Sequence, residues 1–157
     1  MTWQTPEILR LAKEAKDLVE KEVGVEETAS VFIASEGEMT NATLQEQTEL
    51  GRTPEEIERI RFDLQFILGK YFPLSNEIWL VEGRGVILDV IIHEMIHSMQ
   101  RCSLHREGIV DYVTFKITGN RDYVAESVLE EWQEIERSVG YKAIRRRLLS
   151  GGDCEEF

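Results

Sequence analysis

The chain has 157 residues and a formal net charge of -12 at pH 7, and 42% of its residues are hydrophobic while 31% are charged. This length fits a single domain, and the apolar content is too high for a disordered chain, so we expect a packed core over residues 1–157. A surface this acidic repels a phosphate backbone, which argues against nucleic acid as a partner. The arginines at 145–147 are interpreted as the basic end of a helix, where they complement the helix dipole.

The cysteines and the apolar segments bear on the compartment. Cys102 and Cys154 form no C-x-x-C pair, and two cysteines are too few for a disulfide framework, so a reducing compartment is the simpler prediction. Residues 1–11 lack the features of a signal peptide, and the most apolar segment, 86–99, is interrupted by charged and polar residues. We therefore expect a soluble, cytoplasmic protein with no membrane partner.

Capping and periodicity predict the elements of the first half. Thr5 and Pro6 open a helix over residues 6–22 that stops at Gly24, and Thr53 and Pro54 open a second helix that ends near Gly69. Residues rich in strand formers predict a strand at 31–34, a weaker one within 39–45 and a third at 77–81.

The sequence predicts that the second half of the chain is mostly helical. Residues 86–102 form a helix that is apolar nearly all round and is therefore buried on most sides. Residues 103–119 read as a loop with a short strand at 113–117, and Asn120 is expected to cap a helix over 121–138 before a last short helix. The predicted class is α+β, a small antiparallel sheet of about three strands packed with four to five helices.

The buried helix carries the motif His93-Glu94-Met95-Ile96-His97, which matches H-E-x-x-H. Residues four apart on a helix lie nearly above one another, so both imidazoles can bind one zinc ion. Glu94 is turned about 100° from His93 and can act on the metal's water as a general base without binding the metal. Such polar groups are costly in an apolar helix unless a partner satisfies them, which favours a metal site over a purely structural helix.

A catalytic zinc ion needs a third protein ligand and one open position. The metzincin pattern is excluded because it requires glycine and histidine where this chain has Gln100 and Ser103. We favour Glu126 as the third ligand, with His105 and Asp111 as alternatives. Glu130, four positions after Glu126, is well placed to accept a hydrogen bond from a metal-binding imidazole.

His93, Glu94 and His97 followed by a glutamate on a later helix resemble the gluzincin metallopeptidases, and the size resembles the minimal microbial members. In that family a strand before the active-site helix pairs with extended substrate, which implies that Ile78, Trp79, Leu80 and Val81 form the upper rim of the cleft. The family also includes zymogens, which suggests that the acidic tail 150–157, expected to be flexible, can fill the cleft with Cys154 or a carboxylate at the metal. A disordered end is the plainer expectation for this tail.

Other roles are left open by the residues. Tyr112, Tyr123 and His105 are candidates for stabilising the oxyanion, although a tyrosine is more often a core residue. Asp89, one turn before His93, either supports the metal site or caps a loop.

The predicted function is zinc-dependent hydrolysis of a peptide or protein substrate. The alternatives are a SprT-like protease with His105 as third ligand and a non-catalytic, zinc-stabilised peptide-binding protein. The sequence leaves the substrate, the cleavage preference and the oligomeric state undetermined.

Overall fold

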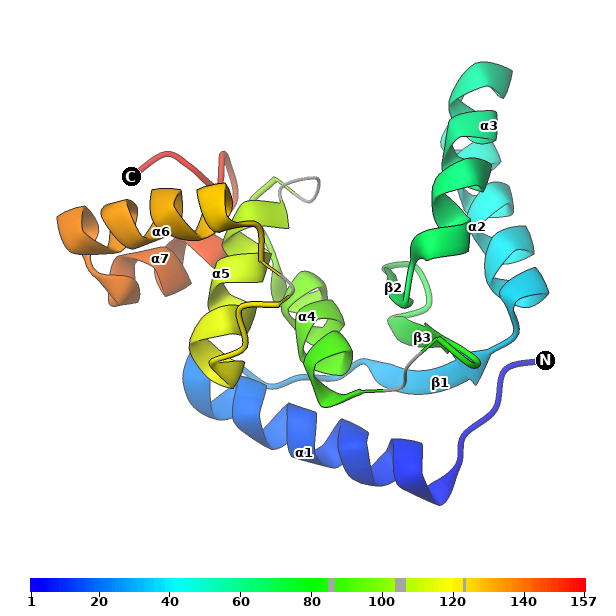
Figure 1. Ribbon diagram of the computed structural model, residues 1–157, viewed down its shortest axis with the longest axis horizontal. Coiled ribbons are helices and arrows are strands. Elements are labelled where there is room, and N and C mark those ends of the chain that lie inside the picture. Colours follow the sequence, from blue (N-terminus) through cyan, green and yellow to red (C-terminus); the bar gives the residue numbers. More distant parts are fainter. Residues whose placement is uncertain (85–86, 104–106, 123) are drawn as a thin grey trace.

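The computed structural model describes residues 1–84, 87–103, 107–122 and 124–157. The elements, in chain order, are α1 (Pro6–Val23), β1 (Ser30–Ala34), α2 (Glu36–Glu49), α3 (Pro54–Asp63), the 3-10 helix η1 (Leu64–Phe66), β2 (Gly69–Phe72), β3 (Glu77–Val81), α4 (Leu88–Met99), α5 (Glu107–Thr118), α6 (Glu126–Val139) and α7 (Tyr141–Leu148). The α+β class predicted from the sequence is confirmed, with seven α-helices among the described residues where four to five helices were expected. The helices α4 to α7 gather on one side of the small sheet, and the pair α2–α3 projects on the other (Figure 1).

The sheet has three strands in the order β1-β3-β2, so β3 lies in the centre. β1 runs parallel to β3, whereas β2 runs antiparallel to it, and the prediction of an antiparallel sheet was therefore wrong for β1. A parallel neighbour requires a long crossover, and the helices α2 and α3 supply it. β2 was not predicted. It forms a hairpin with β3 whose turn uses Asn76 at a φ of 54°, a conformation that asparagine tolerates.

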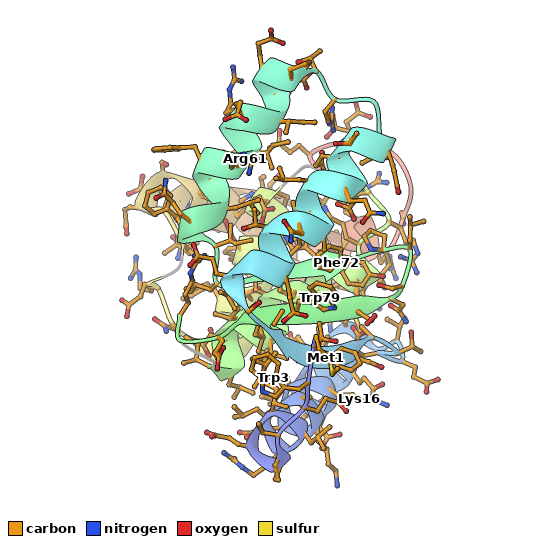
Figure 2. The ribbon with its side chains drawn as sticks, turned by 90° about the vertical axis from the view of Figure 1, so that its right-hand side faces the viewer. Met1, Trp3, Lys16, Arg61, Phe72 and Trp79 are labelled. Atoms are coloured by element: carbon orange, nitrogen blue, oxygen red, sulfur yellow. A yellow bond between two sulfur atoms is a disulfide. The ribbon has the colours of Figure 1, made fainter. Side chains whose placement is uncertain are left out.

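Alternate residues of β3 pack against different helices. Ile78 and Leu80 are fully buried in the main core, to which α1 and α4 also contribute. Trp79 and Val81 face the opposite side, where they pack with Phe72 and with Met39 of α2 in a second, smaller cluster. Phe72 and Trp79 lie side by side beneath α2, with ring centroids 4.6 Å apart (Figure 2). The sheet is thus covered on both faces.

The predicted helix starts at Thr5 and Thr53 are confirmed. The Thr5 side chain accepts a hydrogen bond from the Ile8 N–H at 3.1 Å, and Thr53 forms a capping box with Glu56. A third capping box, Ser35 with Glu38, starts α2. This box was missed, and the strand predicted within 39–45 was wrong, because capping commits these residues to a helix whose few apolar side chains gave no clear periodicity.

The second half differs most from prediction between 103 and 125. Residues 107–118 form the helix α5 rather than a loop with a strand at 113–117. The β-branched residues there favoured a strand, but the hydroxyls of Thr114 and Thr118 donate to backbone carbonyls four residues earlier, which a helix accommodates. α6 begins at Glu126, and Asn120 does not cap it. The Asn120 side chain instead donates to Asp89 Oδ2 at 2.8 Å.

The cysteines are joined in a disulfide, so the expectation of free thiols was wrong and the prediction of a reducing compartment loses its basis. The bond holds the segment 150–157 against the body of the fold, where Cys154 is fully buried. The Ser103 N–H donates to the Gly152 carbonyl at 2.9 Å, and Arg147 donates to backbone carbonyls of the same segment. The tail is therefore packed rather than flexible. Within the described residues, no helix combines the length and the apolar character needed to span a membrane.

Candidate metal centre

α4 presents the two motif histidines on one face. His93 and His97 are one helical turn apart, and their ring centroids are 4.8 Å apart. Both side chains are largely buried, with 24% and 13% of their surfaces exposed. The helix is held in place by its other faces, where Ile91, Ile92 and Ile96 are fully buried in the main core.

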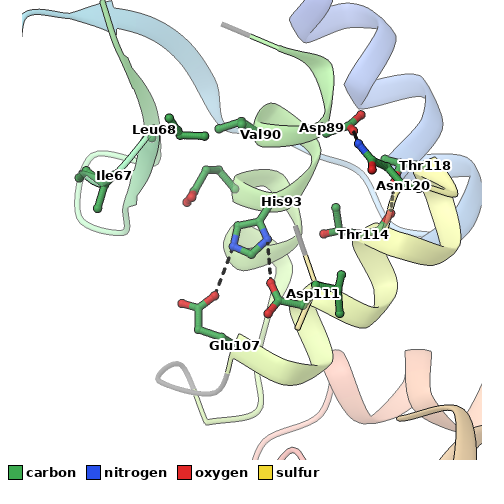
Figure 3. Close-up of a pocket in the computed structure, with 13 residues that line it drawn as sticks. Ile67, Leu68, Asp89, Val90, His93, Glu107, Asp111, Thr114, Thr118 and Asn120 are labelled. Atoms are coloured by element: carbon green, nitrogen blue, oxygen red, sulfur yellow. Dashed lines mark hydrogen bonds and ion pairs between the residues drawn. The ribbon is translucent and has the colours of Figure 1, made fainter. Parts of the chain in front are cut away.

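The third group at this position is Glu107, the first residue of α5. A single carboxylate oxygen, Glu107 Oε2, lies 3.2 Å from His93 Nε2 and 2.9 Å from His97 Nε2. α4 and α5 pack against each other, and Figure 3 shows Glu107 at the start of α5 beside the His93 ring. His93, His97 and Glu107 are the residues whose ligand atoms converge within the described part of the chain.

The outer ring nitrogens are held by further side chains. His93 Nδ1 lies 3.4 Å from Asp111 Oδ1, and His97 Nδ1 lies 3.1 Å from the Gln100 side-chain carbonyl. A carbonyl oxygen only accepts, so His97 Nδ1 carries the proton of this bond. Both imidazoles are therefore oriented with Nε2 directed toward Glu107, the arrangement that supporting residues give to metal-binding histidines.

The donor set fits a divalent metal such as zinc. In neutral imidazoles the two Nε2 atoms carry lone pairs, and these converge on a carboxylate oxygen that is also electron-rich. Atoms of this kind approach one another only around a proton or a cation. Two histidines and one glutamate are a known ligand set for catalytic zinc, and tetrahedral ligands about 2.1 Å from the metal lie about 3.4 Å from one another.

In the absence of a metal, the contacts among these side chains shift their pKa values. Burial alone would lower the pKa of His97, but the hydrogen bond to Glu107 and the charges of Glu94 and Glu107 outweigh it and raise that pKa. Burial also opposes ionisation of Glu107, yet its contacts with both histidines hold its pKa well below the usual range. Burial raises the pKa of Asp111 to about 6. These shifts favour a protonated His97 beside an ionised Glu107.

Glu94 lies beside this centre in a pocket of about 320 Å³. Its side chain is only 9% exposed and has no hydrogen-bond partner among the described residues. The pocket is bounded by α4, α5 and the segment from Ile67 to Gly69 that leads into β2. A carboxylate buried without a hydrogen-bond partner is costly for the fold, which makes Glu94 a candidate functional residue.

The residues predicted as third ligand and its support lie elsewhere. Glu126 is exposed at the start of α6, where its carboxylate pairs with Arg121 at 3.1 Å, and it is not part of the converging group. Glu130 is exposed on the same helix. Asp111, the alternative ligand, contacts Nδ1 of His93 and not the Nε2 atom that is directed toward Glu107. The structure therefore favours Glu107 over Glu126 as the third ligand.

Three further site predictions are corrected or untested. Tyr112 is buried away from the pocket, stacks on Trp132 and donates to Glu136 Oε2 at 3.1 Å, so it is a core residue and not an oxyanion stabiliser. Its burial and its bond to Glu136 raise the pKa of Tyr112 to about 12. His105 and Tyr123 lie outside the described residues.

The substrate rim predicted at Ile78, Trp79, Leu80 and Val81 is wrong. These residues belong to the central strand β3, whose two edges are already paired with β1 and β2, so no edge is left for an additional chain.

A signal for Glu107 was present in the sequence. Glu107 and Asp111 are four residues apart, the same spacing that favoured Glu126 and Glu130, and they begin only ten positions after His97. The pair was passed over because residues 103–119 were interpreted as a loop, where a spacing of four has no meaning.

Comparisons of the chain with protein-family models, with curated proteins and with solved structures found no match. The resemblance to gluzincins therefore rests on the motif and on the residues of the site, and it stays a prediction.

Proposed function

We propose that the protein is a zinc-dependent peptidase in which His93, His97 and Glu107 hold the metal and Glu94 is the general base. The observation that carries the proposal is the position of Glu94: it is nine-tenths buried, without a hydrogen-bond partner among the described residues, in the pocket that His93 and Glu107 of the converging group also line. A bound zinc ion would lower the pKa of a coordinated water and polarise the carbonyl of a peptide bond.

Each residue of the site then has a distinct task. Glu94 takes a proton from the attacking water and passes it to the nitrogen of the leaving amine, so that a carbon–oxygen bond forms as the carbon–nitrogen bond breaks. Asp111 and Gln100 hold the outer nitrogens of His93 and His97, which keeps both rings directed inward. The burial of Glu94 strengthens its interaction with charge that develops beside it.

The substrate chain is best accommodated by β2, which lies at the edge of the sheet and leads into the pocket. The Leu68 carbonyl accepts from Val81 of β3 at 3.0 Å. Because pairing alternates along an antiparallel strand, the backbone groups of Gly69 and Tyr71 face the open edge. An extended peptide that pairs there would lie alongside α4, next to His93 and Glu94.

Gly69 permits this close arrangement. A Cβ atom at this position would lie 2.9 Å from Leu80 Cδ2 and 3.3 Å from Val90 Cγ1 of α4. A larger residue would therefore crowd Leu80 of β3 and Val90 of α4, the helix that carries the histidines.

The test is the variant Glu94→Gln, which keeps the shape of the side chain and removes its basicity. We expect it to bind one equivalent of zinc, measured by elemental analysis, and to lose about 10²- to 10⁴-fold in kcat on a peptide substrate. Glu130→Gln is the matched control, because Glu130 is exposed on α6 and lies outside the pocket. Full turnover in Glu94→Gln would remove Glu94 from the mechanism. Peptide binding without turnover by the zinc-loaded wild type would support the alternative of a non-catalytic peptide-binding protein.

A further inference from the structure

The pocket continues beyond the candidate metal centre as a groove between α4 and α5. One wall is formed by residues of α4 that face the groove in successive turns, and the other by residues of α5 at positions 107, 111, 114 and 118. Glu107 lies at one end of this groove, and Asp89 with Asn120 lies at the other, with His93 between them (Figure 3). The groove therefore leads from the candidate metal centre to the carboxylate of Asp89.

The length of the groove matches a long side chain. Asp89 precedes His93 by one helical turn, which corresponds to about 6 Å along the axis of α4. The flexible four-carbon stem of a lysine spans about the same distance. Val90, Thr114 and Val124 also line the pocket, and their methyl groups suit the methylene stem of such a side chain.

The negative charge of Asp89 at the far end of the groove suits a cationic side chain. Asp89 Oδ2 accepts a hydrogen bond from the Asn120 amide at 2.8 Å, and no lysine or arginine of the described chain pairs with this carboxylate. The described residues that line the pocket include four carboxylates and neither lysine nor arginine. Of these, Glu107 and Asp111 contact the histidines and the charge of Glu94 acts on His97, whereas Asp89 pairs with no cationic side chain of the described residues. A partly buried carboxylate is costly unless a cation accompanies it.

Asp89 also has a simpler role. It lies in the first turn of α4, where a negative charge complements the helix dipole, and it holds Asn120 in place. These roles explain one carboxylate oxygen and its position on the helix. They do not explain why the pocket that holds His93 extends to this carboxylate.

We propose that the groove between α4 and α5 binds a lysine or arginine side chain of the substrate next to the scissile bond, and that Asp89 recognises its positive charge. The proposal rests on the proposed function for the placement of the scissile bond. It assigns a substrate class: peptides with a basic residue at the cleavage site. Acidic residues at that position are excluded by the carboxylates of the groove.

The test uses three peptides that differ only at one central position, which is lysine, norleucine or glutamate. For the zinc-loaded wild type we expect kcat/KM to be about 10- to 100-fold higher for lysine than for norleucine, the range typical of a hydrogen bond to a charged group. Glutamate should be the poorest of the three. In Asp89→Asn the ratio of lysine to norleucine should fall to about one, while zinc content stays at one equivalent.

Asp17→Asn is the matched control. Asp17 is exposed on α1, and its substitution changes the net charge of the protein equally without touching the groove. This variant should keep the wild-type selectivity. A loss of selectivity in Asp17→Asn as well would show that the overall charge, rather than Asp89, selects the substrate.

A binding measurement separates this inference from the proposed function. Fluorescence anisotropy of the same peptides on metal-free Glu94→Gln protein, with and without Asp89→Asn, should show the same ranking in the absence of turnover. Cleavage without preference for lysine over norleucine overturns the inference alone, and this holds for the wild type even if Asp89→Asn fails to fold. Selective binding of the lysine peptide by a protein that cleaves none of them overturns the peptidase and keeps the basic subsite.

Discussion

The third ligand is the point on which the site depends most, and Glu107→Gln tests it directly. Glu107 Oε2 lies 3.2 Å from His93 Nε2 and 2.9 Å from His97 Nε2. The substitution keeps the size of the side chain but removes the charge that binds a cation. Because the Glu107 side chain is 61% exposed, its replacement should leave the fold of the metal-free protein intact.

The expected loss in zinc affinity depends on whether the substituted residue binds the metal or supports a ligand. Loss of a residue that only supports a metal ligand typically costs about 10- to 100-fold in metal affinity. Loss of the ligand itself should therefore exceed about 100-fold, which corresponds to about 2.7 kcal/mol. Asp111→Asn, which weakens the support of His93, should fall within the lower range.

The assay is zinc affinity measured by competition with a chromophoric chelator, on the wild type, Glu107→Gln and Asp111→Asn. Glu126→Gln is the matched control, because it removes the same charge from an exposed glutamate that pairs with Arg121. We expect Glu126→Gln to bind zinc as the wild type does. If Glu126→Gln loses zinc while Glu107→Gln keeps it, the ligand assignment drawn from the packing of α4 and α5 is refuted.

Two further predictions concern stability, measured by urea unfolding in the presence of a chelator. The disulfide joins residues 52 positions apart, and the chain-entropy relation gives about 4 kcal/mol for a loop of that size, so reduction with dithiothreitol should lower the free energy of unfolding by up to this amount. Equal unfolding midpoints for the oxidised and reduced proteins would contradict this. Burial raises the pKa of Glu27, whose carboxylate accepts from Ser98 at 2.6 Å. A raised folded-state pKa means that its contribution is fully present below the ordinary carboxyl value of about 4.3 and is lost as the pH rises through the folded-state value, so the wild type should lose stability over that window relative to Glu27→Gln. Parallel pH profiles of the two proteins would rule this out.

The part of the site that lies within one element was predictable from the sequence. His93, Glu94 and His97 are fixed relative to one another by the geometry of a single helix, and the structure places them in one helix, as expected, with His93 and Glu94 lining a pocket. The apolar composition of that helix also predicted its burial correctly.

The part that depends on two elements was not predictable in the same way. Glu107 meets the histidines only because α5 packs against α4, and neither periodicity nor spacing reports which helices become neighbours. Glu126 satisfied the same local pattern and was preferred because its helix was recognised while α5 was not. Once α5 is known to be a helix, Glu107 and Asp111 stand one turn apart on the face that lines the pocket.

The sheet illustrates a similar limit. The strand at 77–81 was predicted to pair with substrate because it precedes the motif helix, yet the order of strands depends on the unpredicted strand β2 and on the long crossover from β1. Residue patterns identify a strand, whereas its position at an edge or in the centre is decided by partners distant in sequence.

The bond between Cys102 and Cys154 has a mechanical consequence for the candidate metal centre. Cys102 lies in the segment that carries the chain from α4 to α5, and Gln100, just before it, holds the His97 ring. The disulfide therefore fixes the segment that connects α4 and α5, the two helices that carry the candidate ligands, to the residues near position 154. Proteolytic cleavage or a bulky fusion near Cys154 would change the alignment of α4 and α5, although His93, His97 and Glu107 would all still be present.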